Sequence, residues 1–399
     1  MRPFEGKRVL LGVSGGIAAY KSAELVRLLV RAGAEVDVIL TRSGSRFVGP
    51  TTFEGLTGRA VHSSLWDGGG AMAHLELGQA AGAIAVAPAT AALLAKLAAG
   101  MAGDLLTATL LAAPRRALLA PAMNHRMLEH PATQRNLAAL RGDGHTIIGP
   151  AYGELAEREV GWGRMVEPEV IFEHIGRELE PESRWRGRRV VVTAGPTREP
   201  IDPVRFLGNR SSGRMGYAIA AAAWRRGASV TLITGPTDVP VPPGIEDVKP
   251  VETAQEMCSA LHASLDGAAA LFMVAAVADF RPAEPDSQKI RRGDGMKQII
   301  VEAVPDLLAS VAGASCLKVA FAVEMGEGGL ESARRKLEEK GAQMIVLNDP
   351  SEPGAGFEVE TNRVTIVDAS GEAEQLPLAT KGEVADEILN RAERLLPGE

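Results

Sequence analysis

The stretch RVLLGVSGGIAAYKSAELVRLLVRA, residues 8 to 32, carries the pattern that decides the fold. It opens with an apolar run from Arg8 to Leu11, continues through a glycine loop from Gly12 to Gly16, and ends in a segment from Ile17 to Ala32 with helical periodicity. This order of patterns predicts a strand, a loop and a helix. Such a unit is the building block of a parallel α/β sheet.

The same unit recurs through the first half of the chain. Further apolar runs at Val36 to Leu40, Ala83 to Ala87 and Ala117 to Ala120 are separated by helical segments. Strands that are apolar along their whole length are typical of parallel sheets with helices on both faces. The first half is therefore predicted to form one doubly wound α/β domain.

A second domain is predicted after a polar, arginine-rich segment from Glu178 to Arg188. We place the boundary between residues 183 and 184, which gives domains 1–183 and 184–399. The fold class is then α/β, with two doubly wound, Rossmann-like domains. The second domain is expected to contain a strand at Val190 to Val192, a loop at Thr193 to Thr197, a helix at Met215 to Arg226, and strands at Ser229 to Ile233, Ala270 to Val274, Lys318 to Ala322 and Met344 to Leu347.

Composition narrows the class of protein and its partners. The net charge of -7 argues against a nucleic-acid partner. The only cysteines, Cys258 and Cys316, do not have the spacing of a disulfide framework or a zinc site, which favours a reducing compartment. The chain begins without an apolar signal region, and its apolar stretches are too short to span a membrane. We therefore expect a cytoplasmic protein with no membrane partner.

The loop from Gly12 to Gly16 would present backbone N–H groups at the start of a helix, where an anion such as a phosphate binds. It lacks the glycine spacing of a dinucleotide fingerprint and the lysine of a P-loop, so it supports neither site. It matches the Gly-x-Ser-x-Gly elbow of hydrolases, but no acid and histidine follow it in the required order at strand ends. A tight turn without a ligand is the other alternative.

Candidate ligand residues also follow the later strands of the first domain. Pro88 to Thr90 and Pro121 to Asn124 come directly after buried strands, at the edge where open α/β sheets bind ligands. His74 stands alone, and a lone histidine is more often structural than catalytic. His125 and His130 do not form a His-Glu-x-x-His zinc pattern.

These segments together resemble known families. The motifs GVSGGIAAYK at 12–21, APATA at 87–91, PAMN at 121–124 and GWGRM at 161–165 are similar to those of the flavin-dependent cysteine decarboxylases. The second half resembles the phosphopantothenate–cysteine ligases through TAGPTRE at 193–199, DPVR at 202–205, NRSSGRMG at 209–216 and AAVAD at 275–279. The order of the two halves is similar to that of the bacterial bifunctional coenzyme A biosynthesis proteins.

The first resemblance implies a flavodoxin-like domain that binds FMN and decarboxylates phosphopantothenoylcysteine to 4′-phosphopantetheine. The flavin supplies the electron sink for this chemistry. His74 matches the catalytic base of the family, and Asn124 matches the residue that holds the substrate carboxylate. The residues implied to contact FMN are Ser14, Gly15, Gly16, Thr41, Ala89 and Thr90.

One position departs from the decarboxylase pattern. Where the family often carries a proton-donating cysteine, this chain has Glu157. Our hypothesis is that Glu157 stays protonated through burial in the closed site and donates the proton. The alternative is a solvated glutamate in the charge run from Glu157 to Glu159.

The second resemblance implies a ligase that joins 4′-phosphopantothenate to L-cysteine through an acyl-cytidylate, consuming CTP with Mg²⁺. The sequence leaves CTP and ATP both open, and it does not identify metal ligands. Asn209 matches the residue that stabilises the acyl-cytidylate. Lys336 and Lys340 lie four residues apart on a predicted helix, so both can face one ligand, although an exposed lysine pair is the alternative. The implied nucleotide contacts are Ala275, Asp279, Lys289, Pro305, Asp306, Leu307, Leu308, Phe321, Lys336 and Lys340.

Taken together, the resemblances imply a bifunctional enzyme of coenzyme A biosynthesis. They also imply a homo-oligomer of trimeric flavin units, up to a dodecamer. Two alternatives keep the ligase but change the first domain. It would then be an oxidative thiol decarboxylase that releases an ene-thiol, or a flavin-binding regulatory module.

Overall fold

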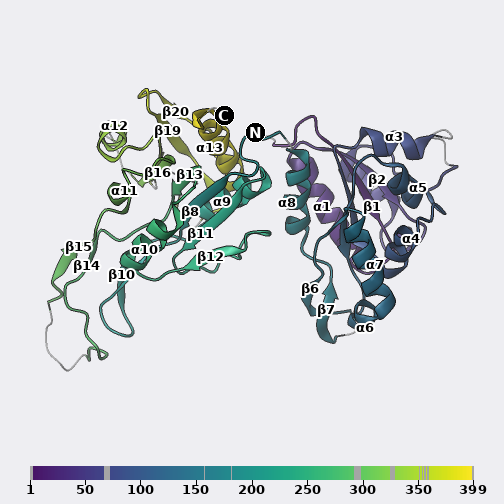
Figure 1. The fold of residues 1–399 in the computed structure, drawn as a ribbon, viewed down its shortest axis with the longest axis horizontal. Coiled ribbons are helices and arrows are strands. Elements are labelled where there is room, and N and C mark those ends of the chain that lie inside the picture. The colour runs from purple at the N-terminus through teal and green to yellow at the C-terminus, as the bar shows by residue number, and fades with distance from the viewer. Residues whose placement is uncertain are drawn as a thin grey trace. The chain divides into compact units, whose positions relative to one another are not determined.

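The computed structural model describes residues 3–66, 72–156, 158–180, 182–291, 298–323, 329–349, 351–352, 354, 356 and 359–397. The chain folds into two compact units, Met1–Glu180 and Pro181–Glu399. This division lies close to the predicted domain boundary. Figure 1 shows a sheet with helices packed around it in each unit, which confirms the predicted α/β class.

The first unit is built on a five-stranded parallel sheet with the order β2-β1-β3-β4-β5. This order defines the flavodoxin-like doubly wound fold. The four predicted strands are present, and the short β5 was not predicted because two residues carry no readable period. The strands are β1 (Arg8–Val13), β2 (Glu35–Leu40), β3 (Ala83–Ala89), β4 (Leu118–Pro121) and β5 (Thr146–Ile147).

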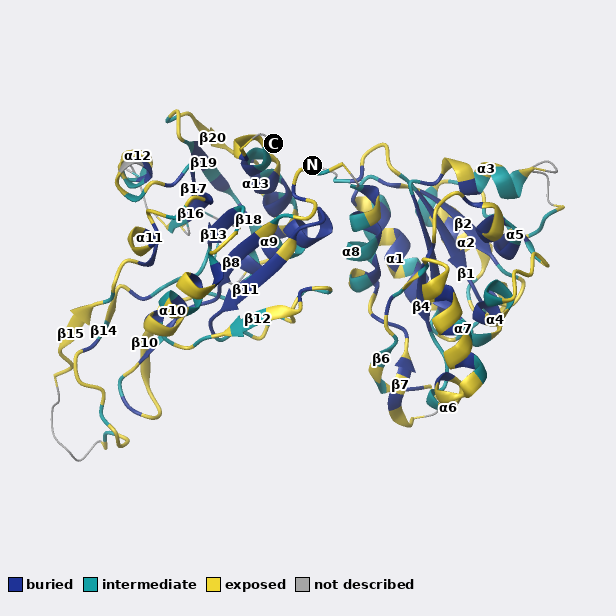
Figure 2. Cartoon of the chain, in the orientation of Figure 1, coloured by how far each residue is buried: buried dark blue, intermediate teal, exposed yellow. Residues whose placement is uncertain are grey.

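Two apolar layers enclose this sheet because successive side chains of a strand point to opposite faces. Val9 and Leu11 of β1 pack into one cluster and Leu10 into the other. The strands β1 to β4 are therefore buried along most of their length (Figure 2), whereas the short edge strand β5 is not. The helices of this unit are α1 (Ala19–Arg31), α2 (Pro50–Thr57), α3 (Ala73–Ala80), α4 (Ala91–Ala98), α5 (Leu105–Ala112), α6 (His125–Glu129), α7 (Pro131–Gly142) and α8 (Pro168–Leu179), with a single 3-10 turn at Gly44–Arg46.

A separate antiparallel hairpin follows the last strand of the first sheet. It consists of β6 (Ala151–Glu154) and β7 (Val160–Arg164). The hairpin is positioned by a backbone bond from the Met123 N–H to the Gly163 carbonyl, 3.0 Å long. Gly163 has a φ of +141°, and a Cβ there would lie 2.1 Å from the Met123 carbonyl oxygen. Only glycine allows the strand to approach this closely.

The second unit has an eight-stranded sheet with the order β12-β11-β8-β13-β16-β17-β19-β20. The first six strands are parallel and follow the Rossmann order 3-2-1-4-5-6, and the last two are antiparallel. The strands are β8 (Arg189–Ala194), β11 (Ser229–Thr234), β12 (Asp247–Pro250), β13 (Ala270–Met273), β16 (Leu317–Val323), β17 (Met344–Asn348), β19 (Val364–Asp368) and β20 (Ala373–Gln375).

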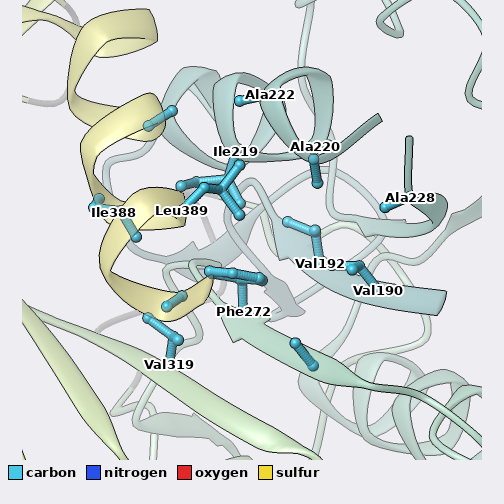
Figure 3. Packing of buried hydrophobic residues seen from close by; sticks show 14 of the residues in the cluster. Val190, Val192, Ile219, Ala220, Ala222, Ala228, Phe272, Val319, Ile388 and Leu389 are labelled. Atoms are coloured by element: carbon cyan, nitrogen blue, oxygen red, sulfur yellow. The ribbon is translucent and has the colours of Figure 1, made fainter. Parts of the chain in front are cut away.

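Helices α9 (Arg214–Arg225) and α13 (Lys381–Leu395) cover one face of this sheet. Figure 3 shows Ile219 of α9 and Leu389 of α13 meeting over Phe272. Small residues let α9 approach the sheet closely, and a Cβ on Gly216 would lie 2.6 Å from the Cβ of Ala194. The other face carries α10 (Ala254–Ser264), α11 (Leu307–Ser310) and α12 (Gly329–Lys340).

Among the described residues of the second unit, three short antiparallel strand pairs stand outside the main sheet. They are β9 (Arg198–Pro200) with β10 (Phe206–Gly208), β14 (Phe280–Pro282) with β15 (Val301–Ala303), and β18 (Thr361–Asn362) with β21 (Ala379–Thr380). Among the described helices of both units, none combines the length and apolar character needed to cross a bilayer.

The stability of the first unit is expected to depend on pH through His174 of α8. Burial, and secondarily the Arg177 guanidinium, lower the pKa of His174 to about 4. In the unfolded chain the pKa of this histidine has its ordinary value of about 6.5, so protonation of His174 favours unfolding. The stabilisation is complete above pH ~6.5 and is lost as the pH falls toward ~4. The protection factors of amides in α1 and α8, which are corrected for the pH dependence of intrinsic exchange, should therefore fall over this range more in the wild type than in His174→Gln. An equal fall in both proteins would contradict this assignment.

Candidate functional site

A cavity of about 1070 Å³ lies in the first unit where the parallel strands end. Its walls come from the loop after β1, the start of α4, the start of α5, residues 122–124, and the hairpin β6–β7. Ligands of open α/β sheets bind at this carboxyl edge. The volume is large enough for a cofactor or a drug-sized ligand.

Three helices begin at this cavity and direct backbone N–H groups toward it. Gly15 to Ala18 lead into α1, and Thr90 and Asp104 cap α4 and α5. Thr90 accepts a hydrogen bond from the Leu93 N–H at 3.5 Å, and Asp104 accepts one from the Thr107 N–H at 2.9 Å. Converging helix starts form an anion-binding environment.

The hydroxyl groups of two predicted cofactor residues are engaged within the protein. Ser14 is 3% exposed, and its Oγ donates to the Pro88 carbonyl at 2.7 Å and accepts from the Thr90 N–H at 3.2 Å. The Thr41 hydroxyl donates to the Val13 carbonyl at 3.1 Å. These side chains therefore shape the loop, which leaves the backbone amides to meet an anion.

The structure brings together most, but not all, of the residues predicted for this site. Asn124 lines the cavity and caps α6, where its side chain accepts from the Arg126 N–H at 2.8 Å. Ala89 is buried in β3, and neither it nor His74 of α3 is among the described residues that line the cavity. Glu157 lies outside the described residues. The predicted cofactor residues that line the cavity are Ser14, Gly15, Gly16, Thr41 and Thr90.

Charged cavity residues to which the sequence assigned no role form ion pairs here. Lys21 Nζ lies 2.9 Å from Glu167 Oε2, and Lys96 Nζ lies 2.9 Å from Asp104 Oδ2. Burial raises the pKa of Asp104, but the Thr107 amide and Lys96 lower it further, so the carboxyl is ionised. Lys21 lies within the motif GVSGGIAAYK at 12–21, and this position in the motif could have identified it as a cavity residue from the sequence.

In the second unit, loops from two neighbouring strands are joined at the carboxyl edge. The Ala276 N–H donates to the Gly195 carbonyl at 2.9 Å, and the Ala278 N–H donates to Thr197 Oγ1 at 2.9 Å. The Asn209 side-chain amide donates to the Val277 carbonyl at 2.7 Å. Asn209 is thus held beside the segment that carries the predicted nucleotide residues Ala275 and Asp279.

The predicted residue Lys289 lies on a segment that is fixed to the β9–β10 turn. The Ile290 N–H donates to Asp202 Oδ2 at 3.2 Å, and Arg205 donates to the Ile290 carbonyl at 2.9 Å. Burial raises the pKa of Asp202, but three backbone N–H groups and Arg205 lower it below its ordinary value. Asp202 and Arg205 therefore fix the backbone of Ile290, directly after the exposed Lys289.

Two of the predicted nucleotide contacts bind each other. Lys340 Nζ of α12 lies 2.5 Å from Asp306 Oδ2, which also caps α11 by accepting from the Ala309 N–H at 3.0 Å. Burial raises the pKa of Asp306, but Lys340 and the α11 amides lower it further. Lys336 is on α12 as well, and Pro305 directly precedes Asp306. Leu307 and Leu308 are core side chains, while Phe321 is half-buried in β16.

Comparisons with known proteins cover both units. The family described as "Flavoprotein" matches residues 2–180, and the family described as "DNA/pantothenate metabolism flavoprotein C-terminal domain" matches residues 185–395. The coenzyme A biosynthesis bifunctional protein CoaBC of Vibrio vulnificus is 42% identical, with 99% of this chain and 100% of the relative covered. The corresponding protein of Mycobacterium bovis is 44% identical, with 98% and 97% covered.

One solved structure is the C-terminal domain of a coenzyme A biosynthesis bifunctional protein CoaBC. It is 42% identical, covers 53% of this chain and 98% of its own, and superposes with a TM-score of 0.44. With relatives that match along nearly the whole length, this chain belongs to the family of coenzyme A biosynthesis bifunctional proteins.

Proposed function

We propose that this chain performs two consecutive reactions of coenzyme A biosynthesis. The second unit ligates 4′-phosphopantothenate to L-cysteine, and the first unit decarboxylates the resulting phosphopantothenoylcysteine to 4′-phosphopantetheine. The observation that carries this proposal is the full-length family match, which unites a flavodoxin-like unit and a Rossmann unit in one chain. The cavity of the first unit and the Asn209 contact in the second supply matching chemistry.

The residues of the first unit fit FMN as the resident cofactor. The backbone amides of Ser14, Gly15 and Gly16, with the start of α4 at Thr90, would hold its phosphate. The chemistry that FMN supplies when bound is a sink for two electrons, which activates the substrate carboxylate for loss of carbon dioxide. Asn124 orients that carboxylate from the cavity wall. Thr41 is half-buried, and its hydroxyl accepts from the Gly44 N–H, which fixes the loop that follows β2.

His74 is the proposed base, and a neighbouring subunit delivers it to the cavity. The motivation is that His74 does not line the described cavity of its own chain, while the proposed assembly is trimeric. We expect a mixture of inactive His74→Asn and inactive Asn124→Asp subunits, after dissociation and reassembly, to regain decarboxylation. Some cavities would then combine an intact Asn124 with an intact His74 from the adjacent chain. If the mixed trimers are as inactive as trimers of either variant alone, His74 does not act in the cavity of a neighbouring subunit.

Glu157 is the proposed proton donor for the final reduction. We expect Glu157→Gln to release the ene-thiol, which has two hydrogens fewer than 4′-phosphopantetheine, because an amide cannot supply the proton. Mass spectrometry of the products measures the ratio of the two compounds. Unchanged production of 4′-phosphopantetheine at the wild-type rate would assign the proton to another group.

The second unit activates the carboxylate of 4′-phosphopantothenate with CTP. Asn209 donates to the acyl-cytidylate, and Lys289, Lys336 and Lys340 hold the triphosphate. Before the nucleotide binds, Asp306 holds the Lys340 ammonium group at 2.5 Å and acts as its counter-ion. When the triphosphate binds, Lys340 either leaves Asp306 or interacts with both anions. Mg²⁺ accompanies the triphosphate. Among the described residues, no cluster of three His, Cys, Asp or Glu side chains is present, which fits a metal held largely by phosphate oxygens.

One experiment tests both halves of the proposal. The purified protein is supplied with 4′-phosphopantothenate, cysteine, CTP and Mg²⁺, and the products are analysed by mass spectrometry. We expect pyrophosphate and 4′-phosphopantetheine from the wild type, and neither from Asn209→Asp. A colourless protein that releases no pyrophosphate would refute the proposal. We further propose that the enzyme works in the cytoplasm as a homo-oligomer with small-molecule substrates only.

A further inference from the structure

The hairpin β6–β7 forms one wall of the cavity in the first unit. Glu154, Leu155 and Ala156 line the cavity from one side of the hairpin, and Gly163 and Arg164 line it from the other. The turn between them is closed by a bond from the Leu155 N–H to the Glu159 carbonyl, 2.8 Å long. Any contact that fixes this turn therefore fixes part of the cavity wall.

The start of α6 provides such a contact through His125. Strand β7 runs beside α6 (Figure 1), and a Cβ on Gly161 would lie only 3.2 Å from the Cβ of His125. Nδ1 of His125 is 3.4 Å from Glu159 Oε2, and Nη2 of Arg126 is 3.9 Å from Glu159 Oε1. The imidazole thus packs on one residue of the hairpin and faces the carboxylate of another.

The His125 nitrogen has an unused bonding capacity that Glu159 can fill. Nδ1 is buried and makes no hydrogen bond with any residue that the structure describes. Glu159 is half-exposed, so its side chain can shift by the few tenths of an ångström that a full bond requires. An imidazole that carries a proton on Nδ1 can donate this bond to the carboxylate.

We infer that His125 and Glu159 act as positioning residues that hold hairpin β6–β7 against the cavity during decarboxylation. His125 directly follows Asn124, the proposed carboxylate ligand, and Glu159 lies two positions after Glu157, the proposed proton donor. The pair therefore couples the segment that orients the substrate to the segment that carries the acid. This inference rests on the proposed function of the first unit.

The pair is tested by a double-variant cycle on the flavin-loaded, full-length protein. We expect His125→Ala and Glu159→Ala each to raise the KM for phosphopantothenoylcysteine and to lower kcat, with a combined loss of kcat/KM of roughly ten- to a hundredfold. The double variant should lose no more than either single variant, because both remove the same contact. Flavin content and the ligation rate should stay at the wild-type level. His125→Asn keeps a side-chain donor and should recover part of the loss.

A second readout does not depend on turnover. Arg158 is exposed in the hairpin turn, so its peptide bond reports how often the turn leaves the cavity wall. Tryptic cleavage after Arg158 should be faster in His125→Ala than in the wild type, and Arg126→Ala, which removes only the 3.9 Å contact, should cleave like the wild type. The His125 variants suit this assay because they leave the cleaved bond unchanged.

The outcomes separate this inference from the proposed function. Losses of kcat/KM that add in the double variant, or unchanged KM and cleavage rates in His125→Ala, overturn the positioning role. A wild-type protein without decarboxylase turnover refutes the proposed function instead, while the cleavage rates still report whether the contact holds the hairpin. Because Glu159 is half-exposed, its replacement does not threaten folding. The Glu159→Ala variant therefore stays informative even if a His125 variant fails to fold.

Discussion

Replacing Gly15 with alanine is expected to weaken the binding of FMN to the first unit. A Cβ at this position would lie 2.4 Å from the Cβ of Ser43 and 2.6 Å from its carbonyl carbon. The loop or the facing backbone must then move, which displaces the amides that receive the phosphate. An overpacking cost of about 1–3 kcal/mol would raise the Kd for FMN by roughly 5- to 150-fold.

Neighbouring glycines provide matched comparisons for this experiment. At Gly16 the nearest atom to an added Cβ is Cγ2 of Thr90 at 3.7 Å, which is an ordinary contact. At Gly55 of α2 no atom lies within 4 Å. Titration of the apoprotein with FMN, followed by flavin fluorescence, should give a much higher Kd for Gly15→Ala than for Gly16→Ala and Gly55→Ala. If Gly15→Ala binds FMN as tightly as Gly55→Ala, the loop does not cradle the cofactor.

Replacing Asp386 with alanine is expected to destabilise the second unit more than other single changes in its ion pairs. Asp386 of α13 is 7% exposed and binds both Arg225 and Arg226 at the end of α9, each 4% exposed. The distance from Arg226 Nη1 to Asp386 Oδ1 is 2.6 Å. Without the carboxylate, two buried guanidinium groups lose their common counter-ion, which costs about 3–5 kcal/mol.

An exposed pair in the same unit serves as the control. Arg281 and Glu302 lie 2.8 Å apart, but both side chains are more than two-fifths exposed, so Glu302→Ala should change the free energy of unfolding by less than about 1 kcal/mol. Tryptophan fluorescence during urea unfolding reports on this unit, because Trp185 and Trp224 are buried here. Equal midpoints for the two variants would show that the buried cluster contributes no more than a surface pair.

Local sequence patterns predicted the secondary structure well where the pattern was long. The expected strand at Ala83 to Ala87 is β3, which is buried along its whole length because helices cover both faces. The expected helix at Met215 to Arg226 is α9 within one residue at each end. Strand β5 was not predicted because two residues offer no period to detect, and β12 was not predicted because its sequence DVKP is not an apolar run.

The site was predicted in part, and the missing part has one physical cause. Gly15 and Thr90 could be recognised because each lies in a short motif beside a strand end. The pairing of Lys340 with Asp306 could not, because the two residues are distant in sequence and meet only when α11 and α12 pack on the same face. The roles of His74, Glu157, Asn209 and the nucleotide residues stay predictions until the experiments above are done.

By itself, the sequence determined the two α/β units, the glycine loop that starts the first helix, and the family. Each of these depends on residues that are neighbours in the chain, where backbone sterics and hydrophobic periodicity act directly. Only the tertiary structure decided that the Ser14 hydroxyl is engaged by β3, that Asn209 reaches the Val277 carbonyl, and that His125 faces Glu159. Those contacts follow from strand order and helix packing, which bring distant segments together and leave no local signal in the chain.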